Sequence, residues 1–225
     1  ATTDATAAYY PGKRVEVTGY PLRREILEAD RAAGIAALKL DPQRRTLLAF
    51  GGSRGSRSIN TTMSAIAPAL LDDNVQIVHI SGRLDWPQVQ QAHAALSPEQ
   101  RRYYQVYDFL PDIGQAFAAA DLVISRAGAS TLAEFPQLGL PAILVPYPHA
   151  WRYQKVNADY LVERGAALRL DDERLGEELL PLVRDLLADD ARLAAMRRAS
   201  EALRQPNGAD NLARLLARTA GHAAA

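Results

Sequence analysis

Residues 122–149 constrain the fold more than any other part of this sequence, because they form one complete strand–turn–helix–strand unit. The apolar run 122–124 is typical of a short strand that is buried on both faces. Small residues at 125–129 predict a tight turn, and Gly139 followed by Pro141 predicts where the next helix ends. A strand buried on both faces needs helices above and below it, so the unit indicates a parallel sheet.

The turn of this unit predicts an anion site. It brings backbone N–H groups and the positive end of a helix dipole to the carboxyl edge of the sheet, where phosphate is the commonest occupant. Ser130 and Thr131 add hydroxyl donors there, and Glu134 lies one turn further on, where its carboxylate could accept from sugar hydroxyls. Thr131 and Glu134 also match a capping box, and their spacing alone leaves both interpretations open.

The rest of the chain repeats the alternation of strand and helix. Six strands are predicted, at 46–50, 75–80, 103–107, 122–124, 142–145 and 166–170. Helices are predicted at 58–71, 86–96, 113–120, 150–164, 173–187, 189–203 and 211–218. This order predicts an α/β fold with a doubly wound parallel sheet, Rossmann-like, whose ligand lies across its carboxyl edge. Ahead of it, residues 14–18 alternate as a strand does, and 23–39 have helical spacing.

A second glycine-rich turn, residues 51–60, follows the first of these strands. It is neither the G-x-G-x-x-G of dinucleotide-binding folds nor a Walker loop, which disfavours nicotinamide enzymes and P-loop NTPases. Gly51 and Gly52 would let a ligand approach the backbone, and Ser53 could donate to it. A plain tight turn is the alternative.

Composition excludes several classes of function. The 225 residues are 48% hydrophobic, which is enough for one sizeable core. The formal net charge is zero, so a nucleic-acid partner is not expected. The absence of cysteine excludes disulfides and cysteine-ligated metal. No apolar run approaches the roughly 18 residues of a membrane-spanning helix, and residues 1–9 lack the features of a signal peptide.

A short apolar loop, Phe109-Leu110-Pro111, follows the third of the six strands. An apolar loop at the carboxyl end of a strand would make a floor for a flat heterocycle. It could equally be a lid on the core.

These segments together carry a resemblance. The motifs stand in a fixed order: GGS-x-G at 51–55, Phe-Leu at 109–110, S-R-A-G-A-S-T-x-x-E at 125–134, G-L-P-A-I-L-V-P at 139–146, and then His149, Gln154 and Asn157. From about residue 19 to its end the chain resembles the donor-binding C-terminal domain of the MurG glycosyltransferases. These GT-B enzymes transfer N-acetylglucosamine from UDP-GlcNAc to undecaprenyl-pyrophosphoryl-MurNAc-pentapeptide.

The resemblance implies roles for residues around the nucleotide. Arg23 would lie near the nucleotide, in a segment where Tyr20 replaces the family's usual Asn. Phe109 and Leu110 would flank the uracil, with the backbone of Leu110 reading the base. Gly52 and Ser53 would belong to the glycine loop of the site. The diphosphate would sit on the turn made by Gly128, Ala129, Ser130 and Thr131.

It also implies roles around the sugar. Glu134 would bind the ribose hydroxyls, Gln154 would bind the GlcNAc hydroxyls, and Asn157 would lie one turn further on. Such a site needs no metal and no cofactor, because the helix dipole and backbone donors stabilise the departing UDP. His149 is a weak candidate for general base, since a capping or packing role competes with it.

The resemblance further implies an organisation into parts. Residues 1–22 would be the end of a missing N-terminal domain and its linker, and 23–225 the UDP-sugar domain. In the family the N-terminal domain binds the lipid-linked acceptor and carries the base, so this chain alone is expected to bind UDP-sugar and transfer little or nothing. The expected location is cytoplasmic, peripheral at the inner face of the plasma membrane when joined to that domain.

Two other hypotheses stay open. The chain could be a natural donor-binding subunit of a split glycosyltransferase that recruits a separate acceptor-binding chain. It could also belong to a GT-B-like UDP-GlcNAc epimerase, although the S-R-A-G-A-S-T stretch favours a transferase.

Overall fold

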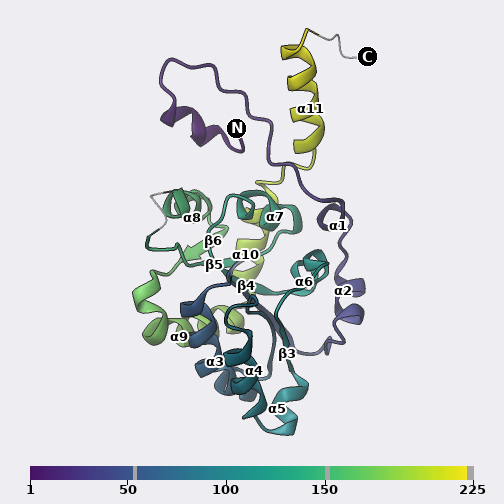
Figure 1. Ribbon diagram of the computed structural model, residues 1–225, viewed down its shortest axis with the longest axis vertical. Coiled ribbons are helices and arrows are strands. Elements are labelled where there is room, and N and C mark those ends of the chain that lie inside the picture. The colour runs from purple at the N-terminus through teal and green to yellow at the C-terminus, as the bar shows by residue number, and fades with distance from the viewer. Residues whose placement is uncertain (53–54, 150–152, 222–225) are drawn as a thin grey trace.

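The computed structural model describes residues 1–52, 55–149 and 153–221. Its centre is a six-stranded sheet in the order β3-β2-β1-β4-β5-β6, in which every neighbouring pair is parallel (Figure 1). The strands are β1 Arg45–Phe50, β2 Val75–Ile80, β3 Tyr104–Tyr107, β4 Leu122–Ser125, β5 Ala142–Leu144 and β6 Ala167–Arg169. The predicted doubly wound parallel sheet is confirmed.

Helices cover both faces of the sheet, because side chains of successive strand residues point to opposite sides. Leu47 belongs to the core with α3 and α9, and Leu48 to the core with α6, α7 and α8. The helices are α1 Arg24–Leu27, α2 Arg31–Ala37, α3 Arg57–Asp72, α4 Trp86–Ala94, α5 Pro98–Arg102, α6 Ile113–Ala119, α7 Thr131–Leu138, α8 Tyr153–Glu163, α9 Leu175–Ala188, α10 Asp190–Glu201 and α11 Gly208–Thr219. Two 3₁₀ helices are η1 Asp4–Tyr9 and η2 Asp172–Arg174.

The order of strands reverses direction between β1 and β4, which lie side by side at the middle of the sheet. The chain leaves β1 towards β2 on one side and leaves β4 towards β5 on the other. The loops that follow these two strands therefore diverge, and ligands of such folds bind in the crevice between them.

The end of α7 agrees with the sequence. Gly139 has a left-handed backbone (φ +59°), and the N–H of Leu140 donates to the carbonyl of Phe135 over 2.9 Å. This is the bond of a Schellman motif, which satisfies a carbonyl at the helix end. The helix is only eight residues long, in keeping with the Pro136 that it contains.

Two predicted elements near the N-terminus are wrong. Residues 14–18 form no strand; Thr18 instead donates its N–H to the carbonyl of Ala1 over 3.0 Å. Alternation alone does not make a strand when no neighbour completes the ladder. The helix predicted over 23–39 is two helices, because Asp30 caps a new start by accepting from the N–H of Ala33 over 3.0 Å.

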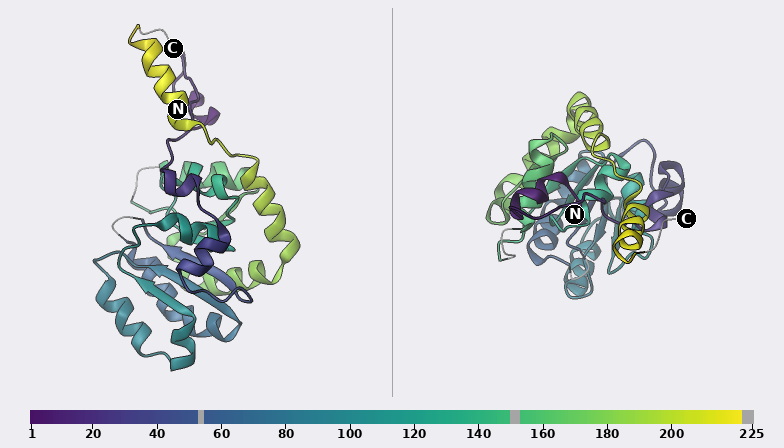
Figure 2. Two further views of the ribbon diagram at one scale, coloured as in Figure 1. Left: turned by 90° about the vertical axis from the view of Figure 1, so that its right-hand side faces the viewer. Right: turned by 90° about the horizontal axis from the view of Figure 1, so that it is seen from above.

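The N-terminal segment and α11 project together from the body of the fold, as Figure 1 and the left view of Figure 2 show. Arg218 of α11 donates to Glu16 over 2.8 Å, and the Asn211 amide donates to the carbonyl of Thr18 over 3.1 Å. These contacts link the two ends of the chain. In the part of the chain that the structure describes, no helix has the length and apolarity to cross a membrane.

Candidate functional site

A cleft of about 760 Å³ opens at the carboxyl edge of the sheet, around the point where the strand order reverses. Its walls come from the loops that follow β1, β2, β4, β5 and β6. The lining residues are Phe50, Gly51, Gly52, Gly55, Ser56, Arg57, Ser58, Leu84, Asp85, Arg126, Gly128, Ser130, Thr131, Tyr147, Pro148, His149, Gln154 and Asp172. Both glycine-rich turns predicted to bind a ligand thus face one cleft.

The β4–α7 turn presents unused backbone donors to this cleft. Within the described residues, no hydrogen bond uses the N–H of Gly128, Ala129 or Ser130. Gly128 and Ser130 line the cleft, and α7 begins directly after them, so its positive dipole end points the same way. Three unpaired N–H groups at a helix start form a ready site for a phosphate-sized anion.

Thr131 and Glu134 form no capping box, which was one of the two interpretations that their spacing left open. The Thr131 hydroxyl donates to the carbonyl of Gly128 over 2.6 Å, and the Thr131 N–H donates to the same carbonyl over 3.2 Å. The helix cap is Ser130, whose carbonyl accepts from the N–H of Glu134 over 2.9 Å. Thr131 is therefore used to close the turn.

Glu134 lies half-buried one turn into α7. Burial raises the pKa of its carboxyl, while the Ser130 side chain and the positive charge of Arg23 act in the opposite direction. Arg23, the exposed cap of α1, is thus near Glu134 in space, although 111 positions separate them in the sequence. Neither residue lines the cleft as described.

The glycines divide into two kinds. A Cβ on Gly51 would lie 2.2 Å from the Ser56 nitrogen, and one on Gly55 would lie 2.2 Å from the Ser81 carbonyl oxygen, so these two are needed for packing of the loop. A Cβ on Gly52 or Gly128 would meet no atom of the described residues within 4 Å. Only the second kind leaves room for a ligand to approach the backbone. Ser53 lies outside the described residues.

The predicted sugar-binding residues of α8 hold neighbouring loops. Gln154 lines the cleft, and its Oε1 accepts from the N–H of Tyr147 over 2.8 Å. Asn157 does not line the cleft; its Nδ2 donates to the carbonyl of Ala127 over 3.0 Å and so supports the β4–α7 turn. The helix is described from Tyr153, whereas the sequence predicted a start at 150, outside the described residues.

Of three further predicted residues, one lines the cleft and two lie outside its lining. Phe109 is exposed and Leu110 packs partly against the core under α6 and α7, so the loop acts in part as a lid. Neither lines the cleft. His149 does line it, and its ring contacts that of Tyr147 edge-on at 5.5 Å.

Sequence reasoning missed an ion pair in the middle of the cleft. Arg126 donates to Asp172 over 2.5 Å and to the Ser58 hydroxyl over 2.8 Å, and Ser58 donates to Asp172 over 2.7 Å. Arg126 also donates to the carbonyls of Val145 and Pro146 over 3.2 and 3.4 Å. The sequence does show an arginine directly after a strand that is buried on both faces. It does not show that the partner of this arginine lies 46 positions further on.

A second ion pair lies on the other wall. Arg57, the first residue of α3, donates its Nε–H to Asp85 over 3.1 Å. Asp85 also accepts from the Asn60 amide over 3.0 Å, and the same amide donates to the Ser81 carbonyl over 2.8 Å.

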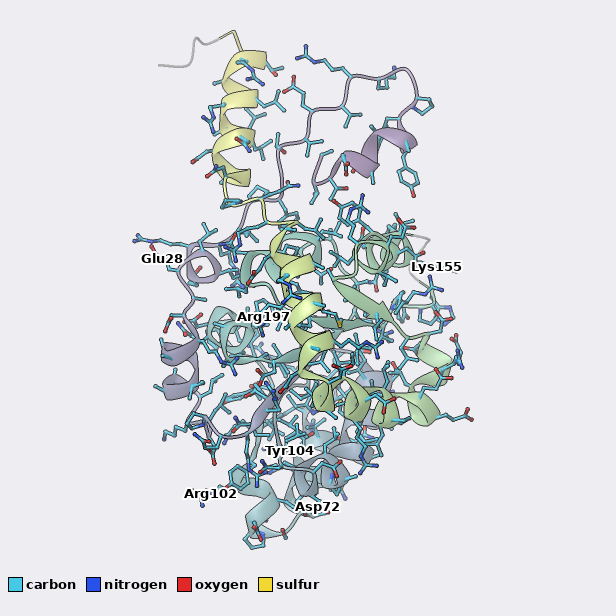
Figure 3. All side chains as sticks on the ribbon, turned by 180° about the vertical axis from the view of Figure 1, so that it is seen from behind. Glu28, Asp72, Arg102, Tyr104, Lys155 and Arg197 are labelled. Atoms are coloured by element: carbon cyan, nitrogen blue, oxygen red, sulfur yellow. The ribbon has the colours of Figure 1, made fainter. Side chains whose placement is uncertain are left out.

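This pair rests on a buried polar chain. The Asn60 carbonyl oxygen lies 2.9 Å from Nε2 of His79, and Nδ1 of His79 lies 2.8 Å from the Tyr104 hydroxyl. Tyr104, labelled in Figure 3, lies in β3 within the body of the fold. Burial lowers the pKa of His79 to about 4 and raises that of Tyr104, so both are neutral at pH 7.

The described residues contain no cluster of three or more histidine, cysteine or acidic side chains of the kind that holds a metal. Among the described residues that line the cleft, the charged side chains are two arginines and two aspartates, each arginine paired with one aspartate. The arrangement suits an anionic ligand held by backbone N–H groups.

Known proteins share both sequence and fold with this chain. The pattern of the glycosyltransferase family 28 C-terminal domain matches residues 46–212. A UDP-N-acetylglucosamine–N-acetylmuramyl-(pentapeptide) pyrophosphoryl-undecaprenol N-acetylglucosamine transferase of Desulforamulus reducens is 37% identical over 217 residues, which cover 94% of this chain and 58% of the relative. The transferase of the same name from a Roseiflexus species is 41% identical, over 90% of this chain and 50% of the relative.

Solved structures agree. The crystal structure of Acinetobacter baumannii MurG has a TM-score of 0.68 and 26% identity, over 88% of this chain and 57% of that one. The S. aureus MnaA–UDP co-structure has a TM-score of 0.66 at 12% identity, over 96% of this chain and 57% of that one, a likeness of fold alone. The chain spans about half to three-fifths of the length of the relatives named here.

Proposed function

Because the chain belongs to glycosyltransferase family 28 through that family's C-terminal domain, we propose that it is the donor-binding part of a MurG-like transferase and that it binds UDP-GlcNAc. The observation that carries the proposal is the β4–α7 turn, where the N–H groups of Gly128, Ala129 and Ser130 have no acceptor among the described residues. They face a cleft large enough for a nucleotide sugar, at the switch point of a parallel sheet.

The diphosphate occupies this turn in the proposed complex. The N–H groups and the dipole of α7 stabilise the negative charge that grows on UDP as the sugar leaves, and no metal is required. Preorganised donors of this kind cost no reorganisation at the moment of reaction. The open space beside Gly52 and Gly128 lets the phosphates approach both turns.

The remaining contacts follow from the positions of the side chains. Glu134 accepts hydrogen bonds from the ribose hydroxyls. Burial raises the pKa of its carboxyl, and the positive charge of Arg23 acts in the opposite direction, towards the ionised form. Gln154, whose carbonyl oxygen is bound to the Tyr147 N–H, offers its amide nitrogen to the GlcNAc hydroxyls. Phe109 and Leu110 contact the uracil once the loop closes on it.

The acceptor is bound by another domain in this proposal. The relatives extend well beyond the matched part, and in the proposed enzyme that further part supplies the lipid-linked acceptor site and the general base. The chain alone then binds UDP-GlcNAc without transferring it. Its working location is the cytoplasmic face of the membrane, reached through that domain.

Calorimetric titration of the chain with UDP-GlcNAc in EDTA tests the proposal, with UDP-glucose and NAD as comparison ligands. We expect the UDP compounds to bind and Glu134→Ala to abolish measurable binding. Glu99→Ala, which removes an exposed carboxylate from α5, is the matched control and should bind as the unmodified chain does. Failure of every UDP compound to bind would refute the donor site.

A further inference from the structure

We propose that Arg57 is a phosphate-binding residue of the cleft and that the buried carboxylate of Asp85 positions it for this contact. The inference rests on the proposed donor site and adds to it a charged group from the start of α3, outside the β4–α7 turn. Arg57 and Ser130 belong to different loops but line the same cleft.

Arg57 is presented to the cleft with most of its donors unused. Its side chain is 78% exposed, and its one hydrogen bond in the described part of the chain runs from Nε to Asp85 over 3.1 Å. The two terminal nitrogens have no hydrogen bond within those residues. A guanidinium fixed at Nε and open at its fork matches two oxygens of a phosphate group.

Stability does not account for this arrangement. Asp85 has only 6% of its side chain exposed, so its carboxylate has lost most of its water. Pairing a buried carboxylate with an exposed arginine recovers little of this cost, because water screens the charge of the exposed partner. We therefore assign a different role to the buried Asp85 carboxylate and its hydrogen bonds, which is to orient the Arg57 side chain.

The supporting network fixes Asp85 from behind. The Asn60 amide donates to both Asp85 and the Ser81 carbonyl, and its oxygen is held by His79. His79 is in turn held by Tyr104, and both rings are buried. These hydrogen bonds fix the orientation of the Asp85 carboxylate. The bond from Nε of Arg57 to Asp85 in turn orients the Arg57 side chain.

The charge of the cleft selects the ligand. Asp172 is already neutralised by Arg126, whose two terminal nitrogens both donate to protein groups and whose side chain is only 11% exposed. Arg57 is thus the cation of the described cleft with donors left for a ligand. A diphosphate can place one phosphate on the β4–α7 turn and the other on Arg57.

Titration calorimetry with UDP, UMP and uridine tests the inference on the full chain. Arg57→Ala should weaken UDP binding about 10-fold and leave uridine binding within two-fold, because only the phosphates meet this residue. Arg57→Lys should restore part of the loss by returning the charge. Arg83→Ala, which removes an exposed charge from the adjacent β2–α4 loop, is the matched control.

Asp85→Asn tests the positioning role. It keeps Arg57 and should weaken UDP binding about 3-fold with uridine unaffected, whereas a purely structural defect would weaken both; thermal unfolding of each variant reports on folding. UDP binding by Arg57→Ala within two-fold of the unmodified chain, or an equal loss for uridine, would overturn the inference while leaving the donor site intact. An unmodified chain that binds no UDP would overturn both.

Discussion

The two arginine–aspartate pairs of the cleft have the same chemistry and opposite burial. Arg126 and Asp172 have only 11% and 19% of their side chains exposed, whereas Arg57 has 78% exposed over an Asp85 with 6%. The first arginine is surrounded by protein acceptors and the second is bound on one side only. Burial of the cation, not the presence of the pair, separates a structural contact from a group available to a ligand.

The Arg126 pair joins the loops of one wall. Its guanidinium binds the chain after β5 through Val145 and Pro146, the start of α3 through Ser58, and η2 through Asp172. The start of α3 and η2 are also joined directly, because the Ser58 hydroxyl donates to Asp172 over 2.7 Å. The shape of the cleft nevertheless depends on Arg126, which binds all three segments.

The largest effect on stability is expected when Arg126, the buried arginine of the two, is replaced. Arg126→Met leaves two carbonyls without their donor and the Asp172 carboxylate with only the Ser58 hydroxyl. We expect the free energy of unfolding to fall by about 3–5 kcal/mol, as for a buried pair that loses one partner. Arg57→Met should change it by less than about 1 kcal/mol, because its pair is exposed on the cation side. Urea denaturation of both variants measures the difference; equal losses would show that burial does not separate the pairs.

The next largest effect is a loss of stability at low pH, which originates in the network behind Arg57. His79 lies beneath the Arg57 wall with its pKa lowered to about 4, from an ordinary value of 6.5. Below pH 6.5 the unfolded chain takes up this proton and the folded chain does not, so stability is lost as pH falls from 6.5 to 4. The loss amounts to about 3 kcal/mol at 1.36 kcal/mol per pKa unit.

Urea denaturation at pH 7, 5.5 and 4 measures this loss, with His79→Gln as the comparison. The variant has no such proton to take up, so its stability should fall less as the pH is lowered. The carboxylates titrate equally in both chains, so the growing difference in stability between the two chains reports on His79. Parallel curves would mean that His79 takes up its proton at the same pH in the folded and the unfolded chain, and that burial does not lower its pKa.

A smaller effect is expected at Glu134, a third carboxylate near the cleft. Burial raises its pKa, so the ionised form costs stability at every pH above the folded value, and the cost vanishes below the ordinary value of 4.5. Glu134→Gln should therefore raise the unfolding midpoint slightly at pH 7 while weakening UDP-GlcNAc binding about 10-fold. A variant that is less stable and binds normally would assign Glu134 to structure.

The sheet was readable from sequence because its strands are short apolar runs bounded by glycine and proline, as at residues 122–124 before the turn and Gly139 after the helix. The same local reading failed at residues 14–18, where alternation finds no sheet neighbour. At Thr131 it left two interpretations open, because a hydroxyl can bond backwards to Gly128 as well as forwards along the helix.

The ion pairs could not be predicted for a different reason. Arg126 and Asp172 stand 46 positions apart, and Arg57 and Asp85 stand 28 apart, so only the strand order brings each pair together. A sequence reports which residue types follow a strand, but the burial that distinguishes the two arginines is a property of the packed loops. The backbone half of the candidate site was therefore predictable and the charged half was not.

The smallest effect on stability is expected at Gly128, on the Arg126 wall. A Cβ there meets no atom within 4 Å, and the residue has no left-handed backbone, so Gly128→Ala should change the free energy of unfolding by no more than about 0.5 kcal/mol. The added methyl group would, however, occupy the space through which a phosphate reaches the turn, and we expect UDP affinity to fall at least 3-fold. Calorimetry and urea denaturation on one preparation separate the two quantities. Unchanged affinity would mean that the phosphates lie nearer Arg57 than the β4–α7 turn. Arg57 would then be the main phosphate contact of the cleft.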